Sequence, residues 1–559
     1  MTRYAFLLIA LSCMMQVEGQ GFLKAKGRII VNDKGEKIIL RGMGLGGWML
    51  QEGYMLRVGS IGQQYRIKEK IAGLAGQKKT AEFYDGWLDN FIRRADIDSM
   101  AAWGFNSVRI PMHYRLFTLP ADSNYPTKPE NVWLPEGFAL VDSLLGWCKS
   151  NKMYLILDLH AAPGGQGNDL NISDRDPSKP SLWQSEANQQ KTIALWKKLA
   201  ERYANEPYIG GYDIINEPNW GFEDSTDRRG TAEKTNAPLR KLMMDITQAI
   251  RSVDKKHIII IEGNGFGNNY RGVLPPWDDN MVLSFHKYGN FNTEASIRNY
   301  LDLREKYNIP LWMGESGENS NTWFTEAIRL VETHDIGWSW WPLKKMGGNN
   351  PLEIAIPRGY QRMLDYWAGK GPRPTEKEAQ DALDELLHAV RCENNIYHRD
   401  VTDAMFRQVY SDEAIPFRQH VIDDSLTIPA VEYDLGRQGV AYFDRDSASY
   451  QYTPGVKTQG NRGRVYRNDG VDIAADPGGY HIFSIEDGEW LQYTVEVKKE
   501  GKYTIWTDTT GYGQVSFYKD GQLLVHMVDG VYLSAGRHQI RVAAVKGGFL
   551  FYALHFKRN

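Results

Sequence analysis

Eight short apolar segments, separated by longer segments of helical pattern, dominate the chain between residues 38 and 341. The apolar segments are nearly continuous, which is typical of strands that are buried on both faces of a parallel sheet. Eight such strands with interleaved helices predict a closed (β/α)₈ TIM barrel, in which the strands form the inner wall. The predicted strands cover residues 38–45, 106–112, 153–160, 210–216, 257–263, 281–288, 310–315 and 336–341.

Helical patterns fill the gaps between these strands, with apolar residues at three- and four-residue spacing. The clearest lie at residues 87–104, 140–152, 189–205 and 239–254, and the first of them ends at a glycine, which is a helix stop signal. A doubly wound open sheet is the alternative architecture. It is disfavoured because no glycine-rich phosphate-binding fingerprint follows the first strand.

The first 19 residues have the pattern of a secretory signal peptide. Arg3 precedes an apolar stretch over residues 4–15 that is too short to span a bilayer, and Gly19 ends a small-residue cleavage site. We therefore expect residues 1–19 to be removed and the protein to be secreted, periplasmic or on the cell surface; a fraying N-terminal helix is the alternative. A lipid anchor at Cys13 is less favoured, because the preceding residues resemble a lipoprotein cleavage box only loosely. No later segment offers ~18 uninterrupted apolar residues, so we expect no membrane-spanning segment.

The composition is that of a globular protein, and 559 residues favour two or three domains. The net charge is −3 and no long basic run occurs, so nucleic acid is not an expected partner. Cys148 and Cys392 are isolated and lack metal-ligand spacing, and we favour two buried thiols over a disulfide. We expect no metal and no cofactor, and we expect a monomer.

Polar side chains stand at the ends of the predicted strands. In a TIM barrel the C-terminal strand ends form the rim on which active sites are built. One charged strand end would be unremarkable, but so many of them together indicate a catalytic or binding site. The set comprises Arg109, His160, Asn216, Glu217, Glu262, His286, Tyr288, Glu315 and Trp341.

Glu217 and Glu315 stand out in this set, because the ends of strands four and seven bring both carboxylates to one cleft. Paired carboxylates across a cleft are the equipment of glycoside hydrolysis, in which one protonates the leaving oxygen and the other attacks the anomeric carbon. Pro218 follows Glu217 directly and keeps it out of a helical conformation. Glu262 is expected to be a supporting residue, and Glu318, beyond a glycine turn, ranks well below Glu315.

At these positions the chain resembles glycoside hydrolase family 5, a clan A family whose barrels carry two glutamates on strands four and seven. The matching motifs, spread over residues 27–345, are LRGMGLGGWML, VRIPM, LDLHAAPGGQ, INEP, HKY, WMGESG and GWSWWPLK. The resemblance implies that Glu217 is the acid/base and that Glu315 is the nucleophile. It also implies substrate-binding roles for Arg109, His160, Asn216, His286, Tyr288 and Trp341.

The chemistry of these residue types suits such roles. Arg109 is placed to stabilise the charge of Glu315, and that charge is expected to raise the pKa of Glu217, so that Glu217 is protonated in the resting enzyme. Asn216 can hydrogen-bond the sugar 2-hydroxyl, a contact that strengthens in the transition state. Trp220 adjoins Glu217 and is expected to contact a sugar.

Beyond the barrel domain, which we place at residues 20–350, the pattern changes twice. Residues 351–425 are helical and rather polar, and we expect them to pack on the barrel as an extension rather than to form a flexible linker. In residues 426–559, period-two strands follow at short spacing with turns such as KDG and KEG between them. This pattern predicts a β-sandwich of jelly-roll type.

The tail resembles a family 6-like carbohydrate-binding module in the motifs VEYDLG, YRNDGVDI, GGYHIFSIEDGEWLQYTVEV, KEGKYTIW and FLFYALHF. The resemblance implies glycan contacts at Tyr466, Tyr480 and Phe549, although the loop tryptophan and asparagine of such modules have no counterpart near Val531 or Phe549. A module that only braces the barrel is the alternative. A structural calcium at Glu432 is not expected, because a matching late acidic ligand is missing.

The sequence therefore predicts a retaining β-glycosidase that acts on β-linked, glucan-type poly- or oligosaccharides. LRGMGLGGWML and DLHAAPGGQ are similar to the β-1,3-exoglucanase branch of the family. Endo-β-1,4-glucanase and mannanase stay open, because linkage is set by loops such as residues 164–183. A non-catalytic carbohydrate-binding barrel is an alternative from a different class, and the intact pair of Glu217 and Glu315 disfavours it.

Overall fold

The computed structural model describes residues 20–59, 61–121, 132–224, 226–445, 460–524 and 530–559. The predicted signal peptide, with Cys13, lies outside these residues. Among the helices that are described, none is long and apolar enough to cross a membrane. Cys148 is buried, Cys392 is partly buried, and both thiols are free, as the sequence predicts.

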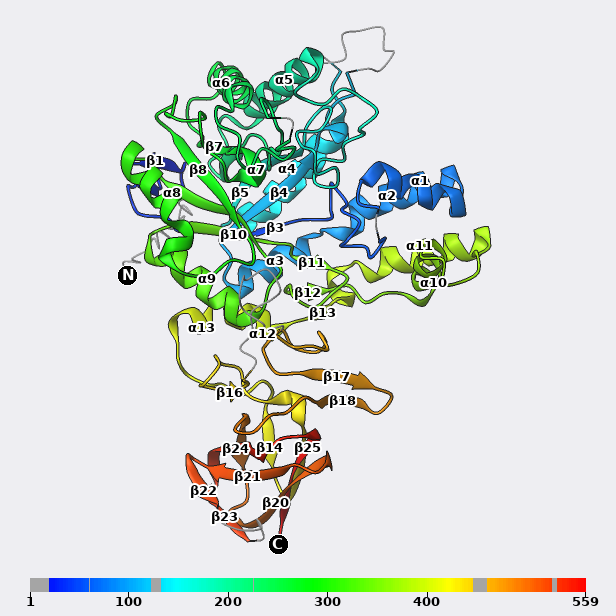
Figure 1. Cartoon of the computed structure of the whole chain (residues 1–559), viewed down its shortest axis with the longest axis vertical. Coiled ribbons are helices and arrows are strands. Elements are labelled where there is room, and N and C mark those ends of the chain that lie inside the picture. The colour runs from blue at the N-terminus through cyan, green and yellow to red at the C-terminus, as the bar shows by residue number, and fades with distance from the viewer. Residues whose placement is uncertain (1–19, 60, 122–131, 225, 446–459, 525–529) are drawn as a thin grey trace, which may run out of the picture.

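A closed barrel of eight parallel strands forms the larger part of the molecule (Figure 1). Each strand pairs with the next along the chain, and β10 closes the ring on β3, so the predicted TIM barrel is confirmed and the open sheet is wrong. Every residue of β4 to β10 is buried, which explains their continuous apolar sequences. The strands are β3 (Arg41–Gly44), β4 (Ser107–His113), β5 (Tyr154–Ala161), β6 (Ile209–Asp213), β7 (Ile259–Glu262), β8 (Met281–Lys287), β9 (Leu311–Gly317) and β10 (Gly337–Trp341). A short hairpin, β1 (Lys24–Lys26) and β2 (Ile29–Val31), precedes them.

Helices cover the outside of the barrel and bury their apolar faces against it (Figure 1). Three of the four predicted helices overlap α4, α5 and α6. The helices of this layer are α2 (Gln77–Phe91), α3 (Arg94–Trp103), α4 (Pro135–Ser150), α5 (Glu186–Tyr203), α6 (Ala237–Arg251), α8 (Glu294–Tyr307) and α9 (Asn321–Thr333), whereas α7 (Asn264–Gly267) is a short turn directly after β7.

The predicted helix at residues 87–104 is wrong as a single element, because α2 ends and α3 begins within it. Ile92 is extended between the two helices, with φ −119° and ψ 126°. The Asp96 carboxylate accepts a hydrogen bond from the Arg93 backbone N–H at 2.8 Å and caps the new helix. Asp96 is itself fully buried against Lys344, with 2.6 Å between the charged atoms. Apolar spacing alone does not reveal this break, because the apolar pattern continues through it and the new start is marked by the polar cap of Asp96.

Most of the predicted extension, residues 351–425, packs on one side of the barrel, but its last part belongs to the C-terminal region, where Ala414 joins the core and His420–Ile422 joins a sheet. In Figure 1, α10 and α11 lie together beside α1 and α2, and α12 and α13 lie against α9. Their apolar side chains belong to the same core as the barrel strands, so this segment is packed structure in place of a linker. The elements of this segment are α10 (Arg358–Trp367), α11 (Glu376–Ala389), α12 (Arg399–Met405), α13 (Arg407–Tyr410), β12 (Leu352–Glu353) and β13 (Ile396–Tyr397). Two elements from earlier in the chain contact them, namely α1 (Gln64–Ala75) and β11 (Lys344–Lys345).

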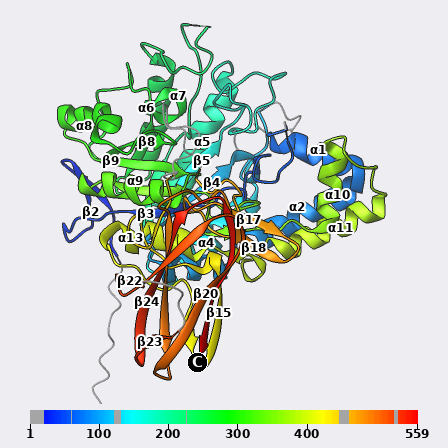
Figure 2. The ribbon, with the colours of Figure 1, turned by 60° about the horizontal axis from the view of Figure 1, so that its bottom comes forward.

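The C-terminal region is an all-β fold with two sheets around a core of its own, as predicted (Figure 2). One sheet has the order β14-β19-β24-β21-β22 with β16 on β19, and the other has the order β17-β18-β25-β20-β23 with β15 on β25. The strand-like sequence IPAVEYDL, residues 428–435, is only partly a strand, since β15 ends at Pro429 and Ala430–Glu432 form a 3-10 turn. The strands are β14 (His420–Ile422), β15 (Ser425–Pro429), β16 (Tyr442–Phe443), β17 (Ile473–Asp476), β18 (Gly479–Ile482), β19 (Trp490–Val497), β20 (Gly501–Gly511), β21 (Gln514–Lys519), β22 (Gln522–Leu524), β23 (Val531–Leu533), β24 (Gly536–Lys546) and β25 (Phe549–Arg558).

Two of the three expected glycan contacts in this region lie near its surface. The rings of Tyr466 and Tyr480 are 4.7 Å apart, and Tyr480 is exposed. Phe549 is buried in the core between the sheets, so the structure does not support a contact there. Glu432 lies 3.3 Å from the Arg418 guanidinium and accepts a hydrogen bond from the Tyr466 hydroxyl, and the adjacent positive charge does not suit a calcium ligand.

A buried polar junction joins the two parts of the molecule. The Asn468 backbone N–H donates to Asp400 at 2.7 Å, and the Asn468 side-chain amide donates to the Asn319 carbonyl at 2.8 Å. From the barrel side, the Asn321 side-chain amide donates to Asp400 at 2.7 Å and to Asp469 at 3.0 Å. All five residues are 3% exposed or less. Because buried amides and carboxylates need partners, neither side of the junction is satisfied without the other.

We expect Asn468→Ala to lower the free energy of unfolding by about 1–3 kcal/mol, because it leaves the Asn319 carbonyl without this donor in a buried site. Asn468→Asp has the same shape and should cost more, since it places a third carboxylate beside Asp400 and Asp469. Denaturant unfolding of the full chain measures both. Wild-type stability in both variants would show that the junction contributes nothing to folding.

Candidate active site

The C-terminal ends of the barrel strands surround a cavity of about 730 Å³, a size usual for ligand sites. Arg109 and Asn216 are fully buried beneath it. From the predicted set, the cavity is lined by His160, Glu217, His286, Tyr288, Glu315 and Trp341. Glu318, which the sequence reasoning ranked below Glu315, also lines it, as do charged and aromatic residues that this reasoning did not place there, among them Glu52, Tyr54, Asp169 and Lys287.

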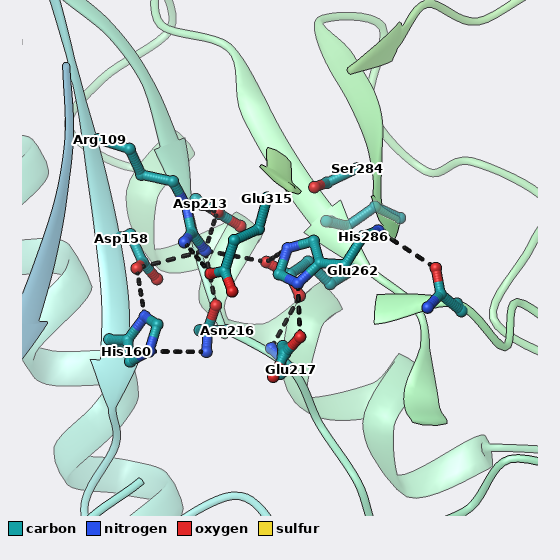
Figure 3. Close-up of polar contacts among 12 residues, drawn as sticks. Arg109, Asp158, His160, Asp213, Asn216, Glu217, Glu262, Ser284, His286 and Glu315 are labelled. Atoms are coloured by element: carbon teal, nitrogen blue, oxygen red, sulfur yellow. Dashed lines mark hydrogen bonds and ion pairs between the residues drawn. The ribbon is translucent and has the colours of Figure 1, made fainter. Parts of the chain in front are cut away.

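Glu315, on β9, has both carboxylate oxygens bonded to the protein. Arg109 Nη1 donates to Oε2 at 2.8 Å (Figure 3). The Tyr288 hydroxyl donates to Oε1 at 2.7 Å. Because Arg109 and Glu315 are 1% and 6% exposed, these bonds act where water screens them little. The arrangement stabilises a negative charge on Glu315 and fixes its position in the cavity wall.

Glu217 sits on a strained piece of backbone, with φ +42° in the left-handed region that non-glycine residues rarely adopt. Its N–H donates to Glu262 at 2.7 Å, and its carbonyl accepts a bond from the Asn219 side chain at 2.9 Å. Pro218 disfavours the right-handed helical region for Glu217 but favours extended backbone, so the left-handed conformation is held by these bonds. Strain of this kind persists only where surrounding bonds over-determine it, and it is concentrated at functional sites. The sequence INEP therefore encodes a rigid corner that presents one carboxyl group.

Two neighbouring groups have perturbed ionisation. Burial raises the pKa of the Glu217 carboxyl above its usual value, and the charges of Glu315 and Glu262 add to this, although the nearby His286 acts in the opposite direction. The expected cause, Glu315, is thus secondary to burial. Burial lowers the pKa of His286, but the charges of Glu262 and Glu315 and the hydrogen bond with Glu217 outweigh it and hold that pKa well above the usual value. Burial therefore favours the neutral form of the Glu217 carboxyl, and the surrounding carboxylates favour the protonated form of His286.

The distance between the two glutamates is short. One ligand atom each of Glu217, His286 and Glu315 lie within 4.8 Å of one another, and within the described residues this is the group that could hold a metal ion. His286 Nδ1 is 2.6 Å from Glu217 and Nε2 is 3.2 Å from Glu262, so both ring nitrogens already face carboxylates. A metal ligand must be a neutral imidazole, so a protonated His286 does not suit this role.

The Arg109 guanidinium is surrounded by four carboxylates (Figure 3). The closest contacts are 3.2 Å to Asp158, 2.9 Å to Asp213, 3.2 Å to Glu262 and 2.8 Å to Glu315. Glu262 is the supporting residue that the sequence predicts, but Asp158 and Asp213 were missed. Each is a single carboxylate inside an apolar run, in LILDLH and in GGYDII. A charge that interrupts a buried strand is the signal that could have found them.

Asn216 connects Arg109 to His160. Its Oδ1 accepts a bond from Arg109 at 2.6 Å, and its Nδ2 is 3.3 Å from His160 Nε2. His160 Nδ1 lies 2.8 Å from Asp158, so a proton held there leaves Nε2 as the acceptor for Asn216. The His160 ring also stacks on Trp341, with centroids 5.0 Å apart and 6° between the planes.

Two glycines, Gly44 at the end of β3 and Gly46 just after it, make room for the Trp341 ring. A β-carbon at Gly44 or Gly46 would lie 2.5 or 2.6 Å from the indole, which no side chain could tolerate. The indole Nε1 donates to the Tyr54 hydroxyl at 3.1 Å and holds the ring in the cavity wall. The glycines of the motif LRGMGLGGWML therefore leave the space that the Trp341 ring fills.

Trp220 and Glu52 differ from the sequence-based picture. Trp220 is not among the residues that line the cavity, and the Arg175 guanidinium lies 5.0 Å from its ring. Glu52, which follows β3, lines the cavity and is 7% exposed. Burial, with the charges of Glu315 and Glu318, raises the pKa of Glu52 well above its usual value. Its only signal in the sequence is a lone carboxylate in an apolar loop after the first strand.

Comparison with known proteins agrees with this site. Residues 66–347 match the cellulase family, glycosyl hydrolase family 5. A β-xylosidase of Phanerodontia chrysosporium is 28% identical over 386 residues, covering 62% of this chain and 76% of that protein. Endoglucanase C of Acetivibrio thermocellus is 25% identical over 321 residues, covering 46% and 86%. A glucan 1,3-β-glucosidase of Blumeria graminis is 28% identical over 269 residues, covering 45% and 56%.

The match extends over half of the chain and includes all the barrel strands after the first, with the two glutamates at the ends of strands four and seven. This chain belongs to the cellulase family, glycosyl hydrolase family 5, and is a glycosidase.

Proposed function

We propose that the protein is a retaining β-glycosidase that acts on glucan-type poly- or oligosaccharides. The observation that carries this proposal is the approach of Glu217 and Glu315, whose nearest carboxylate oxygens lie within 4.8 Å. Retaining enzymes hold the two carboxyl groups ~5–5.5 Å apart, whereas inverting enzymes leave ~6.5–9.5 Å for a water molecule between them and the sugar. The short separation supports direct attack by one glutamate on the substrate.

In the first step, Glu315 attacks the anomeric carbon while Glu217 donates its proton to the departing glycosidic oxygen. A glycosyl ester on Glu315 forms and the aglycone alcohol leaves. In the second step, Glu217, now a carboxylate, takes a proton from water as that water attacks the same carbon and releases Glu315. Arg109 and Tyr288 hold the free carboxylate before and after the reaction.

Burial keeps Glu217 protonated for this role. A carboxyl group with a raised pKa can act as an acid near neutral pH, and the two glutamates take different roles because their surroundings differ. Glu315 accepts hydrogen bonds from the Arg109 guanidinium and the Tyr288 hydroxyl, whereas the buried Glu217 carboxyl contacts the His286 ring.

For the substrate we propose exo action on β-1,3-glucan, as in the branch that the sequence resembles. A relative named glucan 1,3-β-glucosidase supports this, and relatives named β-xylosidase and endoglucanase support a β-linked substrate more broadly. An endo-β-1,4-glucanase or a mannanase is the alternative. We further propose a secreted protein whose C-terminal sandwich is a carbohydrate-binding-like module, for which the exposed Tyr480 beside Tyr466 is the candidate contact.

A product profile tests the substrate. Exo action on β-1,3-glucan should release glucose alone from the first time point, and retention should make the β-anomer the initial product. Chromatography of digests of β-1,3-glucan, β-1,4-glucan and mannan, with NMR of the fresh product, measures both. Early release of mixed oligosaccharides from β-1,4-glucan or mannan would favour the alternative.

Nucleophile and acid can be told apart by variants. Glu315→Ala should abolish activity, and added azide should restore turnover with an inverted glycosyl azide, because the small anion takes the place of the carboxylate. Glu217→Ala should lose about 10²–10⁴-fold on substrates with poor leaving groups and much less on activated aryl glycosides, which need no proton. A glycosyl azide of retained configuration from Glu315→Ala would mean that the roles are exchanged.

The imidazolium beside Glu217 predicts a pH effect. His286 lowers the pKa of Glu217, so His286→Gln should raise it and should move the alkaline limb of the kcat/KM profile to higher pH, even though the rate falls. His160→Gln is the matched control, since His160 bonds Asp158 and Asn216 and its replacement should leave this limb in place. An alkaline limb that shifts downward in His286→Gln would contradict the assignment of Glu217 as the acid.

A further inference from the structure

Glu318 is a second glutamate on strained backbone. It follows β9 three residues after Glu315 and has φ +52°, in the left-handed region. Among non-glycine residues this region favours asparagine and aspartate, so a glutamate here is uncommon. Gly317, directly before it, has φ +142°, and a β-carbon on Gly317 would lie 2.3 Å from the Trp341 carbonyl. The chain therefore leaves β9 through a turn in which Gly317 and Glu318 both have positive φ, and position 317 has no room for a side chain.

The turn directs the Glu318 side chain to the cavity. Glu318 lines the cavity together with Glu52, Tyr54 and Tyr288. Its charge, after burial, is among the causes that raise the pKa of all three groups, which places the carboxylate close to each of them. The side chain is 28% exposed, so a ligand in the cavity can reach it.

A buried lysine orients this carboxylate. Lys345 Nζ lies 2.5 Å from Glu318 Oε1, and the lysine side chain is 8% exposed. Lys345 also lies 5.8 Å from the ring centroid of Tyr54, and Tyr54 bonds the Trp341 indole. Glu318 is therefore held in one position beside the aromatic platform, with its charge compensated from behind and its other oxygen directed away from this bond.

The residues after Glu318 are held from outside the barrel. The Asn319 carbonyl and the Asn321 backbone N–H both bond Asn468 of the C-terminal region, at 2.8 and 2.9 Å. On the other side, Gly317 pairs with Trp341 in the barrel sheet. The strained turn is therefore fixed at both ends, as strain at a functional site requires.

We propose that Glu318 is a substrate-binding residue that determines specificity, by accepting a hydrogen bond from a hydroxyl of the sugar bound next to Glu315. This inference rests on the proposed glycosidase function. A carboxylate accepts hydrogen bonds and sugar hydroxyls donate them, and a bond to a charged acceptor discriminates strongly against a sugar that lacks the hydroxyl. Since the 2-hydroxyl is the expected partner of Asn216, Glu318 is left to bind the 3-, 4- or 6-hydroxyl.

The test pairs variants with deoxy substrates. Glu318→Gly removes the carboxylate and the backbone strain together, and Glu318→Gln keeps the shape without the charge. We expect both to lower kcat/KM on 4-nitrophenyl β-glucoside by about tenfold or more, as for loss of a charged hydrogen bond. On one of the 3-, 4- or 6-deoxy glucosides this loss should disappear, because the partner hydroxyl is already missing. Asn216→Ala is the control and should show the same coupling with the 2-deoxy glucoside.

Melting of the Glu318→Gly variant separates binding from a structural role. If Glu318 serves the substrate, Glu318→Gly made together with Lys345→Met, so that no buried charge is left unpaired, should melt at or above the wild-type temperature, since glycine adopts this conformation freely. A loss that is equal on all the deoxy glucosides, together with a lower melting temperature, would overturn the proposal and leave Glu318 and Lys345 as a structural ion pair. Wild-type enzyme without activity on any β-glycoside would contradict the proposed function, whereas equal losses in active variants contradict only the role of Glu318.

Discussion

The site depends on one buried guanidinium. Arg109 is 1% exposed and lies within 3.2 Å of Asp158, Asp213, Glu262 and Glu315, which come from four other strands. Isolated buried charges are expensive, so none of these carboxylates could occupy its place without the arginine. Burial and the charge of Glu262 raise the pKa of Asp213 well above its usual value, which favours the neutral form of Asp213 and so reduces the excess of negative charge. Because Arg109 lies on one strand and its four partners on four others, the arginine fixes the positions of five strand ends along the barrel axis relative to one another.

Next to Arg109 and its carboxylates, two residues with strained backbone are held rigidly by their hydrogen bonds and ion pairs. Glu217 and Glu318 both have left-handed backbone, and each is bonded through its side chain to a cation, His286 or Lys345. Groups held in this way need little reorganisation when a substrate binds, which is the advantage of a pre-organised site. The strained backbone lowers the stability of the fold, and the burial of the large core that barrel and helices share offsets this loss.

Sequence reasoning succeeded where local pattern and burial coincide. The barrel strands were predictable because their apolar runs are continuous, and the rim residues because polar side chains end those runs. It failed where the cause lies far along the chain. The turn at Glu318 lies against Trp341 and is followed by residues that bond the C-terminal region, and Asp96, which caps the helix after Ile92, is paired with the distant Lys344. Asp158 and Asp213 had a local signal, but it is weak because a single charge in a strand has many explanations.

The polar junction between barrel and sandwich has a consequence for how such chains diversify. Carbohydrate-active proteins are often imagined as interchangeable parts, with a catalytic unit joined to any accessory unit by a linker. Here the amides and carboxylates of Asn321, Asp400 and Asn468 match one another atom for atom in a dry contact. A sandwich without Asn468 and Asp469 at this contact would leave the Asn319 carbonyl and the Asn321 amide without these partners. We therefore expect substitutions on one side of the contact to need compensating substitutions on the other.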